Sequence, residues 1–464
     1  MSAPQELADA ALAASTADGC IVIVAEHSET NLRWAANSLT TNGQMRSRSM
    51  TVISTFDGPD GSRAGVVTRS VTSVDEVPEL ALAAEVAARG ATPADDASPL
   101  VEPYPHDDDW AADPAQTSVS VFDEFAPALG AAFDRWRGDD RLLFGFAEHE
   151  MTSYFLATST GLRRRFDQPT GRIEINGKSG DLSGSAWSGL HTREFADIDV
   201  PTLVDALEQR LGWAGNRLDL PAGRYETILP PTAVADLMIY AYWTASARDA
   251  DDGRNVYSAA SGGTRIGEQL SALPLQLRSD PTAAGLECEP FEVVTSSGGG
   301  LESVFDNGLP VAPVNWIEDG RLNDLVRTRA WAARTSGEPR PFTSNLIMQG
   351  SADGSGASLD DMVESTERGL LLTCLWYIRE VDPQTLLLTG LTRDGVYLIE
   401  DGKVRGAVNN FRFNESPIDL LGRLTEVGAT EPTLSREWSD FFKRTAMPAI
   451  RVPDFNMSTV SQAR

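Results

Sequence analysis

Four histidines and their neighbouring carboxylates are the residues that could support metal-dependent hydrolysis in this 464-residue chain. His149 is followed by Glu150, which is how an HExxH motif begins: two imidazoles one helical turn apart bind zinc, and the glutamate acts as a general base. The sequence continues Met-Thr-Ser-Tyr-Phe, so no second histidine follows. The surrounding polarity alternates as in a strand, where this spacing does not bring two side chains to one face. We therefore interpret His149 as a strand histidine.

Other motifs for covalent or phosphate chemistry are absent from the sequence. The cysteines Cys20, Cys288 and Cys374 form no CxxC pair, which argues against a structural zinc site of that type. There is no GxSxG nucleophile elbow. A run of three glycines, Gly298, Gly299 and Gly300, opens no helix and lacks the Lys-Ser/Thr of a P-loop. It predicts either a flexible turn or a place where a peptide backbone approaches closely.

The densest polar and aromatic cluster is NNFRFNESP, residues 409–417. If this segment is a strand, the side chains of Phe411 and Phe413 face one side, and those of Arg412 and Asn414 face the other. Glu415 or the serine after it then caps a helix. Two interpretations remain: a strand-to-helix junction with two core phenylalanines, or the wall of a groove that contacts a peptide or a partner.

The elements that would position these residues divide the chain into two predicted domains, 1–220 and 221–464. The first mixes helices with alternating strands, and Asn42-Gly43 predicts a hairpin turn between two of those strands. An Ala-, Asp- and Pro-rich stretch at about 91–116 predicts a linker. The second domain begins with a short strand and a helix from about Pro231, and is then mainly Gly-punctuated strands. The predicted fold class is α+β, with a β-rich C-terminal domain.

Composition excludes several partners. The chain has 39 Lys+Arg against 67 Asp+Glu, a formal net charge of −28. A duplex or an anionic membrane surface would be repelled, so we expect neither nucleic acid nor a membrane as a partner. No apolar run is long enough to span a bilayer, and no signal peptide is evident. Three unpaired cysteines suit a reducing compartment, and we expect a cytoplasmic protein.

The order of segments in the second half resembles the TldD/PmbA family of bacterial zinc metalloproteases and their partner subunits. The segments that carry this resemblance are GRYETILPPTAVADLM, GGGLESVFDNGLPVAPVNWIEDGRLNDLVRTRAWAA, SLDDMVESTERGLLLT and GLTRDGVYLIEDGKVRGAVNNFRFNESPIDLL. The order of predicted helices and strands in the first half resembles the same family. The resemblance covers nearly the whole chain, although no segment is a strict motif.

One kind of subunit in that family carries an HExxH-type motif at the start of the helix after the first C-terminal-domain strand. Here that place holds Pro230, Pro231, Thr232 and Ala235, with neither histidine nor glutamate. The family's remaining zinc ligand is a late cysteine, and nothing marks Cys374 as that ligand. The chain therefore resembles the zinc-less TldE (PmbA) type. We expect no cofactor in this chain, and zinc in its partner.

The resemblance implies a heterodimer with a TldD-like zinc subunit that degrades unfolded peptides, held as an added strand in a cavity between the subunits. Two other readings stay open. One is a stand-alone peptide-binding or scaffolding homodimer that kept the fold without hydrolysis. The other is an enzyme with unrelated chemistry, which could use Asp236, Arg248 or Glu226, although the sequence singles out none of them.

Overall fold

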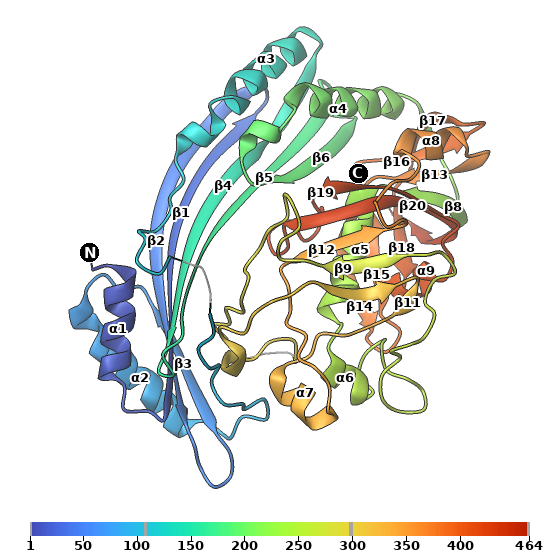
Figure 1. The fold of residues 1–464 in the computed structure, drawn as a ribbon. Helices are drawn as coiled ribbons and strands as arrows, with labels where there is room; N and C mark the ends of the chain where they lie inside the picture. Colours follow the sequence, from blue (N-terminus) through green and yellow to red (C-terminus); the bar gives the residue numbers. More distant parts are fainter. Residues whose placement is uncertain (1, 106–108, 297–299, 462–464) are drawn as a thin grey trace.

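A computed structural model describes residues 2–105, 109–296 and 300–461 of the chain. Two β-sheets dominate it, one from each half of the sequence, and the second half packs against one face of the first sheet (Figure 1). The α+β class predicted from the sequence is confirmed. No helix within the described residues is long and apolar enough to cross a membrane.

The first sheet is antiparallel, with strand order β3-β2-β1-β4-β5-β6. Its strands are β1 (Gly19–Ala35), β2 (Ser38–Phe56), β3 (Arg63–Arg69), β4 (Arg141–Thr158), β5 (Arg163–Ser179) and β6 (Ser185–Thr192). The helices of this half are α1 (Pro4–Ala14), α2 (Val77–Gly90), α3 (Phe125–Gly138) and α4 (Val200–Ala214), with 3-10 turns η1 (Val74–Glu76), η2 (Val119–Phe122) and η3 (Phe195–Asp197).

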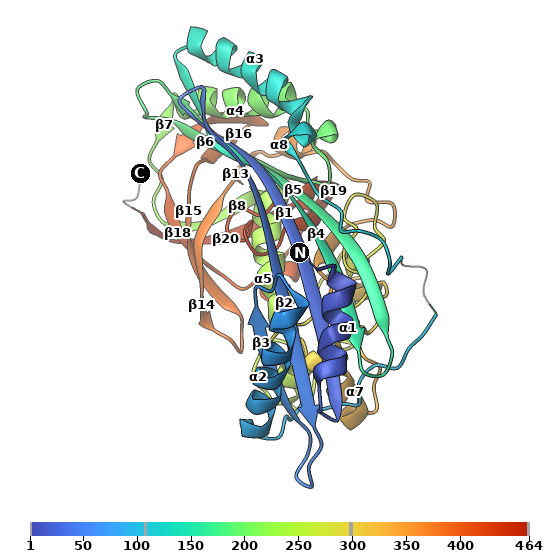
Figure 2. The ribbon, with the colours of Figure 1, turned by 90° about the vertical axis from the view of Figure 1, so that its left-hand side faces the viewer.

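Side-chain alternation assigns the two faces of the first sheet. On β1, Val22 and Val24 pack with α1 and α2, and Leu32 and Trp34, of the same parity, pack with α3. The intervening Ile23 belongs to a core cluster that includes residues of the second half. All four long helices therefore cover one face, and the second half covers the other (Figure 2).

The turn between β1 and β2 corrects the prediction from the sequence. Asn42-Gly43 lies inside β2, and the turn is at Ala36-Asn37, where φ is 48° and 60°. The Asn37 side chain explains this position: its Nδ2 donates to the Arg141 carbonyl at 2.7 Å, and its Oδ1 accepts from the Leu143 N–H at 2.7 Å. Asparagine tolerates a left-handed backbone. The hydrogen bonds of Asn37 to β4 therefore place the turn at Ala36-Asn37, although the dipeptide Asn42-Gly43 has the stronger local preference for a hairpin turn.

The second sheet is mixed and has β20 near its centre. Its main order is β11-β10-β9-β12-β20-β8-β13-β16-β17-β7. In addition, β18 and β19 pair with β20, β15 pairs with β18, and β14 pairs with β15. The strands are β7 (Arg217–Leu218), β8 (Gly223–Leu229), β9 (Gln276–Ser279), β10 (Val314–Glu318), β11 (Arg321–Leu322), β12 (Asn345–Gln349), β13 (Arg368–Leu372), β14 (Leu375–Asp382), β15 (Leu387–Thr392), β16 (Val396–Glu400), β17 (Lys403–Val408), β18 (Phe411–Glu415), β19 (Glu426–Thr433) and β20 (Arg444–Val460).

The largest hydrophobic core lies in this second half, around α5. The helices are α5 (Pro231–Trp243), α6 (Ala247–Asp251), α7 (Arg329–Thr335), α8 (Leu359–Glu364) and α9 (Pro417–Leu421), with a 3-10 turn, η4 (Val304–Asp306). The Ala-, Asp- and Pro-rich stretch has neither helix nor strand in its described residues, 91–105 and 109–116. It contacts both halves: the Tyr104 hydroxyl donates to the Gly308 carbonyl at 2.8 Å, and the Trp110 carbonyl accepts from the Gln5 side chain at 2.8 Å.

Candidate functional site

The start of α5 follows directly from β8. Pro230 is the N-cap, with extended backbone angles, and Pro231 occupies the first helical turn, where its missing N–H costs nothing. The Thr232 hydroxyl donates to the Thr373 carbonyl at 3.3 Å, and Ala235 is fully buried. The four residues that stand where the resemblance places a zinc motif therefore begin a tightly packed helix.

Asp236 is the only carboxylic acid in α5, and it is completely buried. Its Oδ1 accepts the Glu437 N–H at 2.8 Å, whereas Oδ2 has no hydrogen-bond partner among the described residues. Burial raises the pKa of Asp236 well above its usual value, against the lowering effect of the Glu437 N–H. Burial thus favours the protonated form of this core carboxyl, and it is not placed to act as a metal ligand or as a general base on a substrate.

These residues do not fit a zinc ion. Zinc sites use imidazole, thiolate or carboxylate ligands, and the first turn of α5 offers a proline ring, a threonine hydroxyl and an alanine methyl. Burial raises the pKa of the fully buried Cys374 thiol to about 12, so this sulfur is protonated at neutral pH. No chemical step through zinc is derived for this chain.

One group of possible metal ligands occurs elsewhere among the described residues: His27, Glu29 and Glu150, on the face of the first sheet toward the second half. Glu29 and Glu150 are cross-strand neighbours. Lys443 already pairs with one of these carboxylates, with its Nζ 2.9 Å from Glu150. Burial alone would raise the pKa of Glu150, but Lys443 brings it below its usual value. The cluster is an ion-paired contact between the two halves.

His149 lies in β4 with both ring nitrogens engaged. Nε2 is 2.7 Å from the Arg193 carbonyl, to which it donates, so the neutral ring accepts at Nδ1 from the Thr117 hydroxyl at 2.7 Å. Burial lowers the pKa of His149. The interpretation of His149 as a strand histidine agrees with this geometry.

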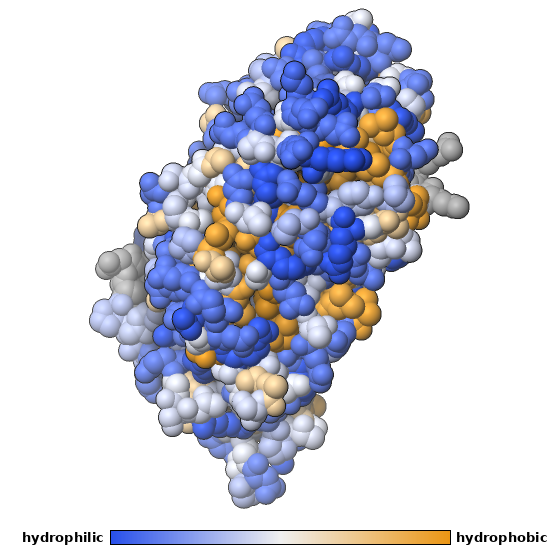
Figure 3. Space-filling view, turned by 90° about the vertical axis from the view of Figure 1, so that its right-hand side faces the viewer, coloured by the Kyte–Doolittle hydropathy of each residue, from blue (hydrophilic) through white to orange (hydrophobic). Residues whose placement is uncertain are grey.

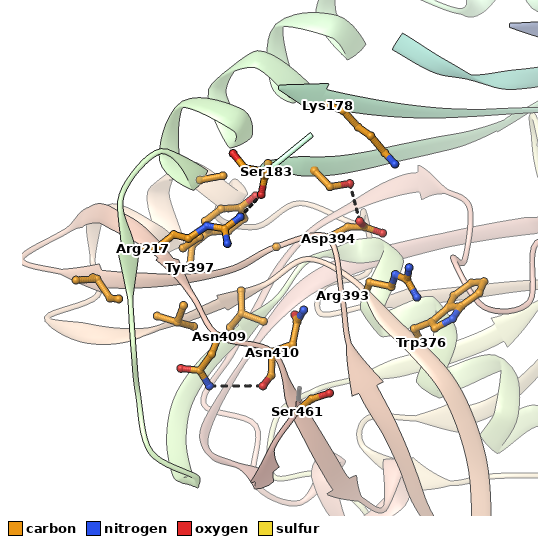
Figure 4. A pocket seen from close by; sticks show the side chains of 18 of the residues that line it. Lys178, Ser183, Arg217, Trp376, Arg393, Asp394, Tyr397, Asn409, Asn410 and Ser461 are labelled. Carbon is orange, nitrogen blue, oxygen red and sulfur yellow. Dashed lines mark hydrogen bonds between the residues drawn. The ribbon is translucent and has the colours of Figure 1, made fainter. Parts of the chain in front are cut away.

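A cavity of about 1200 Å³ lies where the end of the first sheet meets the second (Figure 4). It joins segments that are far apart in the sequence: the β5–β6 hairpin, β7, the start of β14, the β15–β16 turn, and the residues after β17. Its charged lining residues are Lys178, Arg217, Asp219, Arg393, Asp394 and Arg436. The cavity combines charged, amide and apolar side chains, and such a concave site is the default place to look for a ligand.

Arg436 connects the two halves at the cavity wall. Its guanidinium lies between the rings of Trp187 and Trp376, 4.9 and 4.7 Å from their centroids. Its Nη1 is 3.0 Å from the buried carboxylate of Glu174 on β5. Next to it, the Ser185 hydroxyl donates to Asp394 at 2.8 Å. The wall is thus built from charged pairs that cross between the sheets.

The start of α5 lies behind this wall. The Thr232 hydroxyl bonds to the Thr373 carbonyl, and the Thr373 hydroxyl in turn donates to the carbonyl of the cavity-lining Gly395 at 2.8 Å. The residue after Arg436, Glu437, provides the N–H that Asp236 accepts. One layer of backbone therefore separates the packed helix start from the open cavity.

The segment from 409 to 417 is divided between core and cavity. Phe411 and Phe413 are fully buried in β18, which has β15 on one side and β20 on the other. Arg412 is exposed, and Asn414 is half-buried. Neither edge of β18 is open to an added strand. The two residues before it, Asn409 and Asn410, line the cavity.

The other residues of these sequence-based hypotheses are spread through the fold. Glu415 is buried and accepts the Asn456 N–H at 2.7 Å, and Ser416, not Glu415, caps α9. Gly300 has φ of +74° and lies beside Ser246. Gly298 and Gly299 lie outside the described residues.

The residues suggested for unrelated chemistry do not form one site. Asp236 is buried in α5. Arg248, on α6, pairs with Asp95. Glu226, on β8, is 3.0 Å from the Arg451 guanidinium.

Sequence reasoning missed Lys178, Trp376, Arg393 and Arg436, which line the cavity. Each is unremarkable within its own segment, and only the fold brings them together. The one available signal was the scarcity of lysine: Lys178 is one of three in the chain.

Comparisons with known proteins agree with this architecture. The family model described as "PmbA/TldA metallopeptidase C-terminal domain" matches residues 222–459, slightly more than half of the chain. No curated protein matched. A crystal structure of TldE from Thermococcus kodakarensis superposes with a TM-score of 0.79 at 18% identity, covering 98% of this chain and 99% of that one.

Two further solved structures share the fold. A putative modulator of DNA gyrase from Thermotoga maritima gives a TM-score of 0.75 at 15% identity, covering 97% of this chain and 99% of that one. Another from Bacteroides thetaiotaomicron gives 0.75 at 14% identity, covering 98% of each. The structural matches extend the likeness across both sheets, and the family match covers the half that contains α5. The chain belongs to the PmbA/TldD metallopeptidase family.

Proposed function

We propose that this chain is the non-catalytic subunit of a two-chain metallopeptidase, paired with a relative that carries the HExxH zinc motif. The observation that carries this proposal is the start of α5. Pro230, Pro231, Thr232 and Ala235 offer no zinc ligand, and the neighbouring Asp236 is buried with a raised pKa. In this proposal zinc and the hydrolytic step belong to the partner, and this chain contributes a wall of the substrate cavity.

The first sheet offers a surface for such a partner. Within the described residues β3 pairs only with Met50–Phe56, so the outer edge of β2 from Ser38 to Ser49 has no neighbouring strand. An open edge can accept a further strand through main-chain hydrogen bonds. Leu39 and Met45 on this stretch are 56% and 53% exposed.

A second surface lies on the far side of the molecule. There, apolar side chains gather in separate areas between hydrophilic ones (Figure 3). Separate apolar areas are ordinary on a protein surface, so the open β2 edge is the feature that supports an assembly larger than one chain.

The substrates in this proposal are unfolded peptides, bound in extended form and cleaved in the cytoplasm. A peptide bound as an added strand is held by its main chain, which tolerates many side-chain sequences. The described cysteines are all buried and free, as expected in a reducing compartment.

The test is co-expression with the HExxH-bearing relative of the same organism, followed by size-exclusion chromatography, zinc analysis and cleavage of an unfolded protein substrate. We expect a mixed complex with about one zinc per pair, consistent with a single catalytic site, and cleavage only when both chains are present. A partner with its motif glutamate changed to glutamine should assemble without cleaving. If the relative alone cleaves the substrate as fast as the mixture of both chains, the proposal is wrong.

Two matched variants locate the interface. Leu39→Asp with Met45→Asp places charges on the β2 edge, and Leu82→Asp with Val86→Asp places them on α2, where the original residues are 57% and 61% exposed. We expect only the first pair to prevent assembly. If both pairs assemble normally, the β2 edge is not the contact.

A second candidate, a stand-alone peptide-binding homodimer, is favoured by the cavity, because both of its walls come from one chain. It predicts a metal-free homodimer that leaves the relative's activity unchanged in the same experiment.

A further inference from the structure

The cavity wall is positively charged in a strongly acidic protein. Its lining contains four cations against two carboxylates, whereas the whole chain has a formal charge of −28. Clefts with low-dielectric walls focus the field of such charges and concentrate ligands of opposite sign. An anion attracted to this molecule would therefore meet its most favourable potential in the cavity.

Three of the four cations, Lys178, Arg217 and Arg393, have no carboxylate partner among the described residues, but Arg217 is engaged by a backbone carbonyl. Arg436 is paired with Glu174, and Arg217 donates to the Ser183 carbonyl. The Lys178 ammonium, from β5, lies over the ring of Phe144, 5.4 Å from its centroid, and makes no ion pair within the described residues. Arg393, from the β15–β16 turn, makes no side-chain ion pair. Figure 4 shows Lys178 on the first sheet, pointing toward the side of the cavity where Arg393 and Trp376 lie.

The rest of the lining suits a peptide. Asn176 carries an amide group that can both donate to and accept from a main chain, whereas the amides of Asn409 and Asn410 already bond within the wall. Leu182 and Val460 provide apolar contacts. The volume of about 1200 Å³ exceeds the ~300–1,000 Å³ typical of small-molecule sites.

We propose that this cavity binds the carboxylate end of a peptide, with Lys178 and Arg393 holding the carboxylate from opposite walls. Arginine presents a planar fork that matches a carboxylate, and lysine supplies a point charge. A singly charged carboxylate meets less repulsion from Asp219 and Asp394 than a doubly charged phosphate does. The proposal needs neither a partner nor zinc, so it stands or falls separately from the proposed function.

The scarcity of lysine allows a direct measurement on the unmodified sequence. Reductive ¹³C-methylation keeps the positive charge of lysine and gives one dimethyl-lysine signal for each of Lys178, Lys403 and Lys443, with the Lys178→Arg variant assigning the first. The probe is a Gly-Ala-Ala-Leu-Ala peptide with a free C-terminal carboxylate, compared with its C-terminal amide and with inorganic phosphate. We expect the free acid alone to shift the Lys178 signal saturably, while exposed Lys403 stays unmoved.

Affinity for the fluorescein-labelled free-acid peptide gives the second readout. Lys178→Met with Arg393→Met should weaken binding about tenfold or more, because two charge-assisted hydrogen bonds are lost. The control, Arg368→Met with Lys403→Met, removes the same charge from exposed positions outside the cavity and should bind like the parent.

Several outcomes would overturn the proposal. These are equal binding of acid and amide, absence of saturable binding up to millimolar peptide, or an unchanged affinity of the cavity variant. A Lys178 shift produced by phosphate and not by the peptide would reassign the cavity to phosphate ligands.

Discussion

The first turn of α5 and the cavity in front of it are neighbours with opposite character. At the helix start, Ala235 and Asp236 are fully buried, and burial raises the pKa of the Asp236 carboxyl. One backbone layer away, Lys178 and Arg393 face an open space without ion-pair partners. The position where the family resemblance places hydrolytic chemistry has become structural, and the charged, solvated chemistry lies in the adjoining wall. Substitutions should therefore affect stability at the first place and ligand binding at the second.

Arg436 joins the two regions, and its loss should have the largest effect. Arg436→Ala removes contacts to two tryptophans and takes from the buried Glu174 its nearer cation, leaving Arg172 at 3.7 Å. Breaking one partner of a buried pair costs about 3–5 kcal/mol, so the free energy of unfolding in urea should fall by about that amount. The control Arg368→Ala loses only an exposed contact, 3.6 Å from Glu400, and should cost under about 1 kcal/mol. Equal losses for the two variants would contradict this ranking.

Introducing the HExxH residues at the start of α5 tests whether the packing there leaves room for a zinc site. Ala235→His inserts a polar ring where a methyl group packs, and overpacking a core typically costs about 1–3 kcal/mol. Urea unfolding should show this loss, whereas Thr232→Glu, at a half-buried position, should cost less. The triple change Pro231→His, Thr232→Glu, Ala235→His should bind no stoichiometric zinc by elemental analysis. Tight zinc binding with unchanged stability would mean that the helix start opens readily.

Asp236 should make stability depend on pH. Its folded pKa lies above the unfolded value of about 3.9, so above that value the folded state retains a proton that the unfolded chain has lost. The stabilisation is complete below pH ~4 and is lost as pH rises toward the folded pKa, at up to about 1.4 kcal/mol per pH unit. Asp236→Asn lacks this pH-dependent contribution. Its free energy of unfolding in urea should therefore increase relative to that of the parent between pH 5 and 8. A difference that does not change with pH would show that Asp236 is ionised in the folded protein.

The cavity wall should give the smallest change in stability. Arg393 is exposed and makes no ion pair among the described residues, so Arg393→Met should alter the free energy of unfolding by no more than about 0.5 kcal/mol. Thermal unfolding of the two proteins side by side is sufficient. A loss above 2 kcal/mol would place Arg393 among the structural residues with Arg436.

The elements of this fold were predictable where local pattern and tertiary structure agree. The strand and helix around Pro231, the buried phenylalanines of β18 and the cap before Pro417 all follow from alternation and capping rules. The β1–β2 turn was not predictable, because contacts of Asn37 with residues a hundred positions away outweigh the preference of Asn42-Gly43.

The cavity was beyond sequence reasoning for a related cause. Lys178, Arg217, Arg393 and Arg436 come from segments separated by tens to hundreds of residues, and none has a motif around it. Only Asn409 and Asn410 lay next to a segment that had attracted attention, and there the aromatic residues proved to be core. A resemblance located the start of α5, but the packing behind it could be read only from the fold.

The central place of β20 also bears on how the molecule is made. The first sheet consists of strands within residues 19–192, so a growing chain can complete it early in translation, since domains form in the order of synthesis. The second sheet needs residues 444–460, which pair with β8, β12, β18 and β19. Until those residues leave the ribosome, β8 and β12 lack the strand between them. The apolar side chains that β20 covers in the folded protein are then exposed. The need for chaperones should thus be greatest while the second half is being synthesised and β20 is not yet available.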